Sequence, residues 1–372
     1  MEDMALTSAK NGSFWRDKRV LLTGHTGFKG SWLAIWLHRL GAKVTGISLP
    51  PATVPNLYGE AKVGALCQSH FCDIRDARAL TTLIQAARPE IVFHLAAQPL
   101  VRASYGEPSA TFATNVMGTV HVLDALRGTG ARVAVMVTTD KVYRDGESPL
   151  PHREDDPLGG HDPYSASKAA CEIVIASYRD AFLLAQGLAV ASARAGNVIG
   201  GGDWSDDRVI PDAVRAWQAG RPLQVRRPQA VRPWQHVLEP LYGYLILAQR
   251  LWEQPVLAAA YNFGPETTDA VSVRDLVELA RVAYGEGEAR YGDGSEGPHE
   301  VAWLALNSAK ARNLLGVSPA LTLAQAVRRT MAWYRAHNMG AEARQLCEAD
   351  IADFEARALA AAAPAAAVKM AG

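Results

Sequence analysis

The sequence has few cysteines, and their spacing fits neither a disulfide framework nor a metal site. Four occur in 372 residues without a Cys-x-x-Cys pair, which argues against a disulfide scaffold and against a zinc site. Excess charge is absent too, because 38 Lys and Arg balance 38 Asp and Glu. A chain without net charge has no overall field for gripping a polyanion, so we expect no nucleic-acid partner and no membrane partner.

Long apolar runs are also missing. The longest stretches without a formal charge, 44–59 and 108–123, are interrupted by prolines or by polar side chains, which is not typical of a membrane span. The acidic start has no apolar segment behind a basic end, so we expect no secretory signal and a cytoplasmic location. With 49% apolar and 20% charged residues, the composition indicates a globular protein with room for two domains.

What is present is an alternation of β-branched runs with amphipathic stretches, the pattern of βαβ units around a parallel sheet. It predicts strands at 19–23, 43–47, 70–72, 91–94, 132–138 and 189–194. It predicts helices at 28–40, 76–87, 110–127 and 163–180, and a weak helical patch at 57–66. We therefore predict an α/β fold, a doubly wound parallel Rossmann sheet with a smaller C-terminal α/β substrate-binding domain.

The domain boundaries follow from where this periodicity stops. We predict a dinucleotide-binding domain at 17–195, to which 237–263 returns with one helix and one strand. Residues 196–236 and 264–345 would form the substrate-binding domain. The alanine-rich end, 358–372, is low in complexity and is expected to be frayed or weakly helical.

A glycine motif, Thr23-Gly24-His25-Thr26-Gly27-Phe28-Lys29-Gly30, lies between the first predicted strand and helix. In that place, missing side chains let a pyrophosphate approach the backbone, and the helix N-terminus supplies amide donors. The motif therefore predicts a dinucleotide site; the alternative is a tight turn only. After the second strand there is no carboxylate for a ribose and no Arg for a 2′-phosphate, which leaves NAD favoured over NADP.

Asp73 follows the third predicted strand and is open to two interpretations. It could accept a hydrogen bond from the adenine amino group of the dinucleotide. Alternatively, it caps the helix that starts near Asp76.

Tyr164 and Lys168 are four residues apart and so share one helix face. A nearby cation stabilises a phenolate, so Tyr164 is expected to act as a base near neutral pH. The pair alone is a weak signal, but the glycine motif upstream strengthens it.

Thr138-Thr139-Asp140-Lys141 ends the fifth predicted strand, whose carboxyl end faces the ligand crevice of this fold. A solvated Asp–Lys pair is the plain interpretation. In a half-buried crevice, however, the carboxyl group stays protonated and the amine tends to its neutral form. An acid beside a base suits an elimination.

Five arginines and no acid occur between Ala213 and Leu238, namely Arg215, Arg221, Arg226, Arg227 and Arg232. Guanidinium groups match phosphate oxygens, so some of the five are expected to hold a nucleotide diphosphate. Arg215 and Arg221 are the ones we assign to a solvated surface. The scattered histidines predict no metal site.

Together, these motifs and His94-Leu95-Ala96-Ala97 resemble the extended short-chain dehydrogenase/reductase family. Within it, the chain is similar to the sugar-nucleotide dehydratase branch, and to its CDP-glucose group, nearly throughout to about Trp333. The similar segments are GHTGFKGSW, FHLAAQPLVR, TNVMGT, DPYSASK, RAGNVIGGGDW and RPWQHVLEPL. The branch generally has Glu after Thr-Asp, and the CDP-glucose group has lysine there, as Lys141 is here.

The resemblance implies roles for particular residues. Thr139 would polarise the sugar 4-hydroxyl, Asp140 would be the acid and Lys141 the C5 base, with Tyr164 and Lys168 completing the catalytic set. The NAD-binding set would be Gly24, Thr26, Gly27, Phe28, Gly30, Asp73, Ile74, Leu95, Ala96, Ala97, Thr114, Thr138, Tyr164 and Lys168. The substrate-binding set would be Gln98, Arg102, Asn197, Arg208, Arg232 and His299.

The implied activity is dehydration of CDP-glucose by C4 oxidation, C5/C6 elimination and hydride return to C6. It would serve deoxysugar biosynthesis, as for the O-antigen of lipopolysaccharide. A homodimer or dimer of dimers is expected, paired through the helices predicted at 110–127 and 163–180. Two alternatives stay open: a 4,6-dehydratase or 4-epimerase for another nucleoside diphosphate sugar, and a non-catalytic nucleotide sensor.

Overall fold

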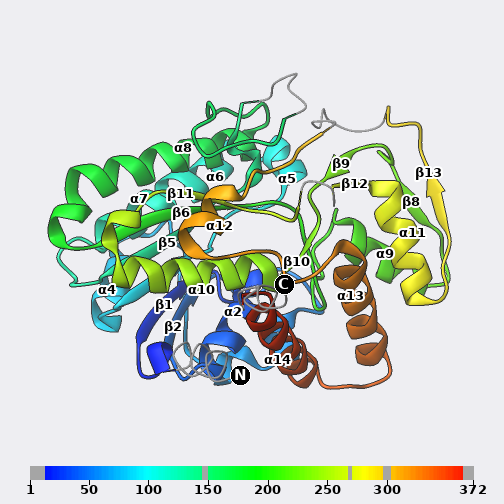
Figure 1. Ribbon diagram of the computed structural model, residues 1–372, viewed down its shortest axis with the longest axis horizontal. Coiled ribbons are helices and arrows are strands. Elements are labelled where there is room, and N and C mark those ends of the chain that lie inside the picture. Colours follow the sequence, from blue (N-terminus) through cyan, green and yellow to red (C-terminus); the bar gives the residue numbers. More distant parts are fainter. Residues whose placement is uncertain (1–12, 145–149, 267–269, 296–302, 363–372) are drawn as a thin grey trace, which may run out of the picture.

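A seven-stranded parallel sheet forms the centre of the protein (Figure 1). The structure is a computed structural model that describes residues 13–144, 150–266, 270–295 and 303–362. Across the sheet the strands are β11 (Ala260–Phe263), β6 (Ala189–Ala195), β5 (Val133–Val137), β4 (Ile91–His94), β1 (Arg19–Thr23), β2 (Lys43–Ser48) and β3 (Gln68–Phe71). All neighbouring pairs are parallel. This order confirms the predicted doubly wound Rossmann sheet.

Helices cover both faces of the sheet, which is why β4, β5 and β6 are buried along their whole length. One face carries α2 (Phe28–Arg39), α10 (Leu238–Glu253) and α14 (Ala343–Ala362). The other carries α4 (Ala77–Ala87), α7 (Gly118–Ala125) and α8 (Pro163–Tyr178). Two apolar cores result, the larger one around Trp32, Trp36 and Leu241 on the first face. The second contains Leu80 and Ile175.

A smaller lobe lies at one end of the molecule (Figure 1). Its short strands pair as β8 (Leu223–Val225) with β13 (Ala289–Tyr291), β9 (Val231–Arg232) with β12 (Val271–Ser272), and β7 (Val198–Ile199) with β10 (Gln235–His236). Its helices are α9 (Val209–Gln218), α11 (Val273–Tyr284) and α13 (Leu323–Asn338). Trp217 and Tyr284 pack together between α9 and α11, with ring centroids 5.3 Å apart.

Three C-terminal segments lie against the main sheet or its helices. Helix α10 packs on β5 and β6, and β11 extends the sheet beside β6. Helix α12 (Ala309–Leu315) contacts α10 and β11, so part of the predicted substrate-binding range adjoins the sheet. Helix α14 packs on α2 and includes residues 358–362 of the predicted tail, with Ala358 buried. The domain boundaries themselves stay a prediction.

The helix predicted at 110–127 is a run of three pieces. These are α6 (Pro108–Phe112), the π-helical turn η2 (Ala113–Met117) and α7. The wide turn directs the Asn115 amide at the Ser167 hydroxyl of α8, 2.9 Å away, and at the backbone of Gln98. Such turns are often found at functional sites.

Short elements complete the chain. They are α3 (Leu57–Glu60), η1 (Val63–Ala65), α5 (Val101–Gly106), η3 (Asp140–Val142), η4 (Arg179–Leu183), η5 (Leu184–Gln186) and η6 (Pro255–Leu257). Among the residues described, we find no helix with both the length and the apolar character that crossing a membrane requires.

Candidate active site

The glycine motif forms the loop between β1 and α2. A Cβ on Gly24, where φ is +79°, would lie 2.7 Å from the Ala96 nitrogen, and one on Gly30 would lie 2.0 Å from the Gly24 oxygen. Both glycines are therefore required for the turn and its contact with the end of β4. Gly27 is exposed, and α2 has neither a side-chain cap nor an acid in its first turn. No side chain caps the amides in the first turn of α2, which leaves them available to an anion, and the loop fits a dinucleotide pyrophosphate.

The ends of β2 and β3 flank this loop. The hydroxyl groups of Thr26 and Ser48 are hydrogen-bonded to each other at 2.8 Å, and Thr26 Oγ1 also donates to the Leu49 carbonyl. Both hydroxyl groups therefore have partners within the protein. Asp73 pairs with Arg75, whose hydrogen bonds lower the pKa of the carboxyl group. Asp76, and not Asp73, caps α4, so the capping interpretation of Asp73 is wrong. Its contact with adenine stays a prediction.

Leu95, Ala96 and Ala97 follow β4 beside the glycine loop, and Leu95 and Ala97 line a cavity at the carboxyl ends of the strands. The amides of Leu95 and Ala96 donate to Thr23 Oγ1, each at 3.2 Å, which ties the ends of β1 and β4 together. Ile74 packs on Gly118, and a Cβ on Gly118 would lie 2.4 Å from Cδ1 of Ile74. Thr114 lies in η2 and, like Ile74 and Phe28, is not part of the cavity wall.

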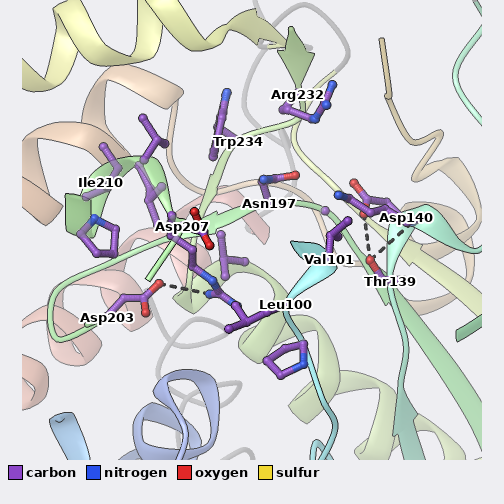
Figure 2. A pocket seen from close by; sticks show the side chains of 18 of the residues that line it. Leu100, Val101, Thr139, Asp140, Asn197, Asp203, Asp207, Ile210, Arg232 and Trp234 are labelled. Carbon is purple, nitrogen blue, oxygen red and sulfur yellow. Dashed lines mark hydrogen bonds and ion pairs between the residues drawn. The ribbon is translucent and has the colours of Figure 1, made fainter. Parts of the chain in front are cut away.

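The end of β5 brings Thr138, Thr139, Asp140 and Lys141 to this cavity. Thr139 caps η3: its hydroxyl accepts from the Lys141 amide and donates to Asp140 Oδ1 at 3.0 Å (Figure 2). Asp140 is only 2% exposed, and its Oδ2 has no hydrogen-bond partner among the described residues. Burial raises the pKa of Asp140, which favours the protonated acid that an elimination needs.

Helix α8 carries Tyr164 and Lys168 to the same cavity. Asp162 caps this helix by accepting from the Ser165 amide at 2.9 Å. Burial raises the pKa of Tyr164 to about 12, although a hydrogen bond with Thr139 acts to lower it. The expected ionisation near neutral pH is thus not found in the protein by itself, because desolvation outweighs nearby cations. Lys168 Nζ donates to the Val137 carbonyl at 3.2 Å, and burial lowers its pKa.

A buried ion pair between Glu172 and Arg194, 2.9 Å apart, lies behind these residues. Glu172 also accepts from the Thr138 hydroxyl, directly after β5, and from the Ser192 hydroxyl of β6. One carboxylate therefore joins α8, β5 and β6 next to Lys168. Glu172 is not among the predicted site residues, although it stands four residues after Lys168, on the same helix face.

The cavity has a volume of about 360 Å³ and reaches from the sheet to the smaller lobe. Figure 2 shows Thr139 and Asp140 at one side of the view, Asp203, Asp207 and Ile210 at the other, and Asn197 between them. The wall is thus built from both parts of the chain. All five predicted catalytic residues line it.

Four of the six predicted substrate-binding residues also line the cavity, namely Arg102, Asn197, Arg208 and Arg232. Gln98 does not: its side chain donates to Thr111 Oγ1 and accepts from the Leu100 amide, which holds the turn after β4. Local hydrogen bonding within the protein thus accounts for Gln98. His299 lies outside the described residues.

Several cavity residues were not found by sequence reasoning. Lys29 comes from the first turn of α2, its Nζ donates to the Tyr244 hydroxyl at 2.9 Å, and burial lowers its pKa to about 7. Asp203 pairs with Arg208 at 3.1 Å, and Asp207 pairs with both Arg102 and Arg226. The signal for the aspartates was their position just before the arginine-rich segment. No sequence signal marked Lys29 as a cavity residue, because the direction of its side chain depends on tertiary packing.

The fold and the site define an enzyme that binds a dinucleotide and holds a tyrosine, a lysine, a threonine and a buried acid at one cavity. The chain belongs to the NAD dependent epimerase/dehydratase family, whose model matches residues 20–264. NAD is therefore its cofactor.

Relatives of known name extend this assignment. The chain is 43% identical over 349 residues to the CDP-glucose 4,6-dehydratase of Salmonella typhimurium, covering 92% of this chain and 97% of that protein. It is 28% identical over 370 residues to GDP-mannose 4,6 dehydratase 2 of Caenorhabditis elegans, covering 89% and 93%. The crystal structure of a UDP-glucose-4-epimerase from Stenotrophomonas maltophila, with bound NAD and formylated UDP-arabinopyranose, has the same fold. Its TM-score is 0.75 at 22% identity, over 87% of this chain and 99% of that one.

Proposed function

We propose that the protein is a CDP-glucose 4,6-dehydratase, a hydro-lyase that converts CDP-D-glucose to CDP-4-dehydro-6-deoxy-D-glucose and water. The observation that carries this is the convergence of Thr139, Asp140, Lys141 and Tyr164 on one cavity. The 43% identity to a CDP-glucose 4,6-dehydratase, over nearly the whole of both chains, supports the substrate.

The first half of the reaction needs a base at the sugar 4-hydroxyl. Tyr164 takes that proton as a phenolate, which Lys168 and the positive nicotinamide ring of bound NAD would stabilise, and Thr139, on the wall of the same cavity, polarises the 4-hydroxyl. The glycine loop, Leu95–Ala97 and Lys168 would hold NAD, which would supply the hydride acceptor for oxidation at C4 and the hydride donor for reduction at C6. Oxidation leaves a ketone at C4.

The second half removes water. The 4-ketone acidifies the proton at C5, and Lys141 takes it. Asp140 gives a proton to the 6-hydroxyl, so water departs and a 4-keto-5,6-ene remains. The buried position of Asp140 and its raised pKa support this role, because an ionised carboxylate could not donate.

A 4-epimerase or a 4,6-dehydratase for another nucleotide sugar is the alternative within the family. An epimerase shares the glycine loop and the Tyr164–Lys168 pair but has no need of an acid and a base at 140 and 141. A non-catalytic nucleotide sensor needs neither set. The buried acid Asp140 beside Lys141 therefore favours dehydration.

The test is to incubate the protein with NAD and, separately, CDP-, dTDP-, UDP- and GDP-glucose, and to weigh each product. We expect loss of water from CDP-glucose and little or none from the others. With deuterium at C4 of the sugar, the label should appear at C6 of the same molecule. Product of unchanged mass with inverted C4 would instead assign an epimerase.

We extend the proposal to a cytoplasmic homodimer that serves deoxysugar biosynthesis, as for the O-antigen of lipopolysaccharide. Apolar side chains on the helices expected to pair support the dimer: Phe112 of α6, Met117 of η2 and Ile173 of α8 are 40%, 46% and 64% exposed. Contact of such a surface with a second copy would remove it from water. Light scattering should give a dimer for the natural chain and a monomer for Ile173→Glu.

A further inference from the structure

The sugar and the base of the proposed substrate belong at opposite sides of the cavity. The reacting carbons of the sugar lie beside Asp140, and the arginines of the smaller lobe are suited to the diphosphate that joins the sugar to the nucleoside. Figure 2 shows Ile210 across the cavity from Asp140. Ile210 belongs to α9, which packs on β8. The base is therefore expected at the wall that α9 and β8 form.

This part of the wall suits the flat faces of a base. Ile210 is 2% exposed, and Leu223 and Val225 of β8 are 4% and 5% exposed. Covering an apolar wall with a planar ring removes its surface from water, and a few polar groups then fix the orientation of the ring. The apolar residues that line the cavity here are Val209, Ile210, Leu223, Val225 and Val273.

One carboxylate borders this apolar wall. Asp212 lies in the first turn of α9 and lines the cavity, with 36% of its side chain exposed. Its Oδ1 accepts a hydrogen bond from Arg215, and no described residue donates to its Oδ2. One oxygen of Asp212 is thus available to a donor on the base.

The partner of Asp212 keeps this carboxylate in place. Arg215 also donates to the carbonyl groups of Trp204 and Ser205, and it is not part of the cavity wall. The pair can therefore persist when the cavity is filled. In contrast, Asp207 pairs with Arg102 and Arg226, which line the cavity.

A carboxylate can distinguish the pyrimidine bases. It accepts hydrogen bonds and, when ionised, donates none. Cytosine carries an amino group at C4, which is a donor, whereas uracil and thymine carry a carbonyl oxygen there. An aspartate at this edge of the base attracts cytosine and repels the other two.

We propose that Asp212 reads the 4-amino group of cytosine through Oδ2 and thereby selects cytidine among the pyrimidine nucleotides. The base lies against the apolar residues of α9 and β8, and its amino group donates to the carboxylate. This inference rests on the proposed dehydratase function, because it names the residue that selects the base of that substrate.

The test measures the affinities for CDP and UDP by calorimetry, with saturating NAD, at pH 8. Burial raises the pKa of Asp212, and this pH keeps its carboxyl group ionised. The natural protein should bind CDP about 10–100-fold more tightly than UDP. In Asp212→Asn the ratio should fall below about 3-fold, because an amide can turn to accept from cytosine or donate to uracil. Arg215→Met, which keeps the carboxylate, should retain a preference for CDP of at least about 10-fold.

An unchanged ratio in Asp212→Asn would overturn the inference, and so would equal loss of the ratio in Arg215→Met or equal binding of CDP and UDP by the natural protein. If Asp212→Asn does not fold, the natural protein is tested with the diphosphate of pyrimidin-2-one riboside, which is CDP without the amino group. Binding about 10-fold weaker than that of CDP would support the inference, and equal binding would overturn it. If the natural protein selects CDP through Asp212 but forms no dehydrated product from CDP-glucose, the proposed function fails and the reading of cytosine stands.

Discussion

The two ends of the cavity hold their charged groups in opposite ways. At the reaction end (Thr139, Asp140, Tyr164, Lys168), every residue is less than a tenth exposed, and burial moves the pKa values of the acid, the phenol and the amine. At the other end, where we propose that the nucleotide binds and which we call the nucleotide end (Arg102, Arg208, Arg226, Asp203, Asp207), arginines that are about a third exposed pair with aspartates.

The difference follows from what each end has to do. Buried groups whose desolvation outweighs nearby opposite charges reach the protonation states that proton transfer requires. The pairs of Asp207 with Arg102 and Arg226 are open to water and worth little, so these arginines can exchange the aspartate for a phosphate at small cost. Chemistry and binding are thus separated along one cavity.

The largest expected effect is at the reaction end. Asp140→Asn removes the acid, so we expect kcat for dehydration to fall by about 10²–10⁴-fold. The affinity for CDP, measured by calorimetry, should not change, because the nucleotide end is intact. Normal turnover by Asp140→Asn, or loss of its CDP binding, would contradict the separation of catalysis and nucleotide binding between the two ends.

Arg232 tests whether a buried arginine near Asn197 belongs to the nucleotide end. It lines the cavity and is only 5% exposed. Arg232→Met should weaken CDP binding by about 10–100-fold, the usual worth of a charge-assisted hydrogen bond, about 1.5–3 kcal/mol. Arg221→Met is the matched control, since Arg221 is exposed and outside the cavity wall. Equal effects of the two substitutions would contradict the assignment.

Lys29 lies between the two ends, and its pKa of about 7 is below the ordinary value of 10.5. Unfolding therefore takes up a proton between these values, so Lys29 makes the free energy of unfolding rise with pH from about 7 to 10.5. From pH 7 to 9, urea unfolding should show a gain in the natural protein that exceeds the gain in Lys29→Met by on the order of 1 kcal/mol. Lys62→Met, at an exposed lysine, should match the natural protein. Parallel profiles for the natural chain and Lys29→Met would count against a desolvated amine.

The smallest effect is expected at Asp207, which pairs with both Arg102 and Arg226. Asp207→Asn removes a competitor for these arginines, so CDP affinity should rise by less than about 5-fold at low salt. The gain should vanish at high salt because exposed charges are screened. Weaker CDP binding by Asp207→Asn would mean that the aspartate positions the arginines instead of competing with phosphate.

Prediction from the sequence succeeded where the signal is local. The runs RVLLT and IVFH are strands β1 and β4 with the predicted bounds, because a run of buried β-branched and apolar residues between helices has few alternatives. The loop at Gly24–Gly30 and the end of β5 could be placed for the same reason. The fold then brings their side chains together, since carboxyl ends of parallel strands share one edge.

Prediction failed where a distant contact decides. Helix 110–127 contains a π-helical turn because Asn115 reaches Ser167 of another helix. Gln98 is bound by Thr111 and is held away from the cavity. The pKa of Tyr164 depends on how deeply α8 is covered, which no local pattern reports.

The C-terminal helix α14 braces the helix that carries the glycine loop. Phe354 packs edge-on against Trp36 of α2, and the Trp36 indole donates to Glu355 at 2.8 Å. A chain shortened before Ala343 would keep every residue that faces the cofactor, yet α2 would lose its outer support. We therefore expect the affinity for NAD to depend on a helix that contributes no residue to the cavity wall.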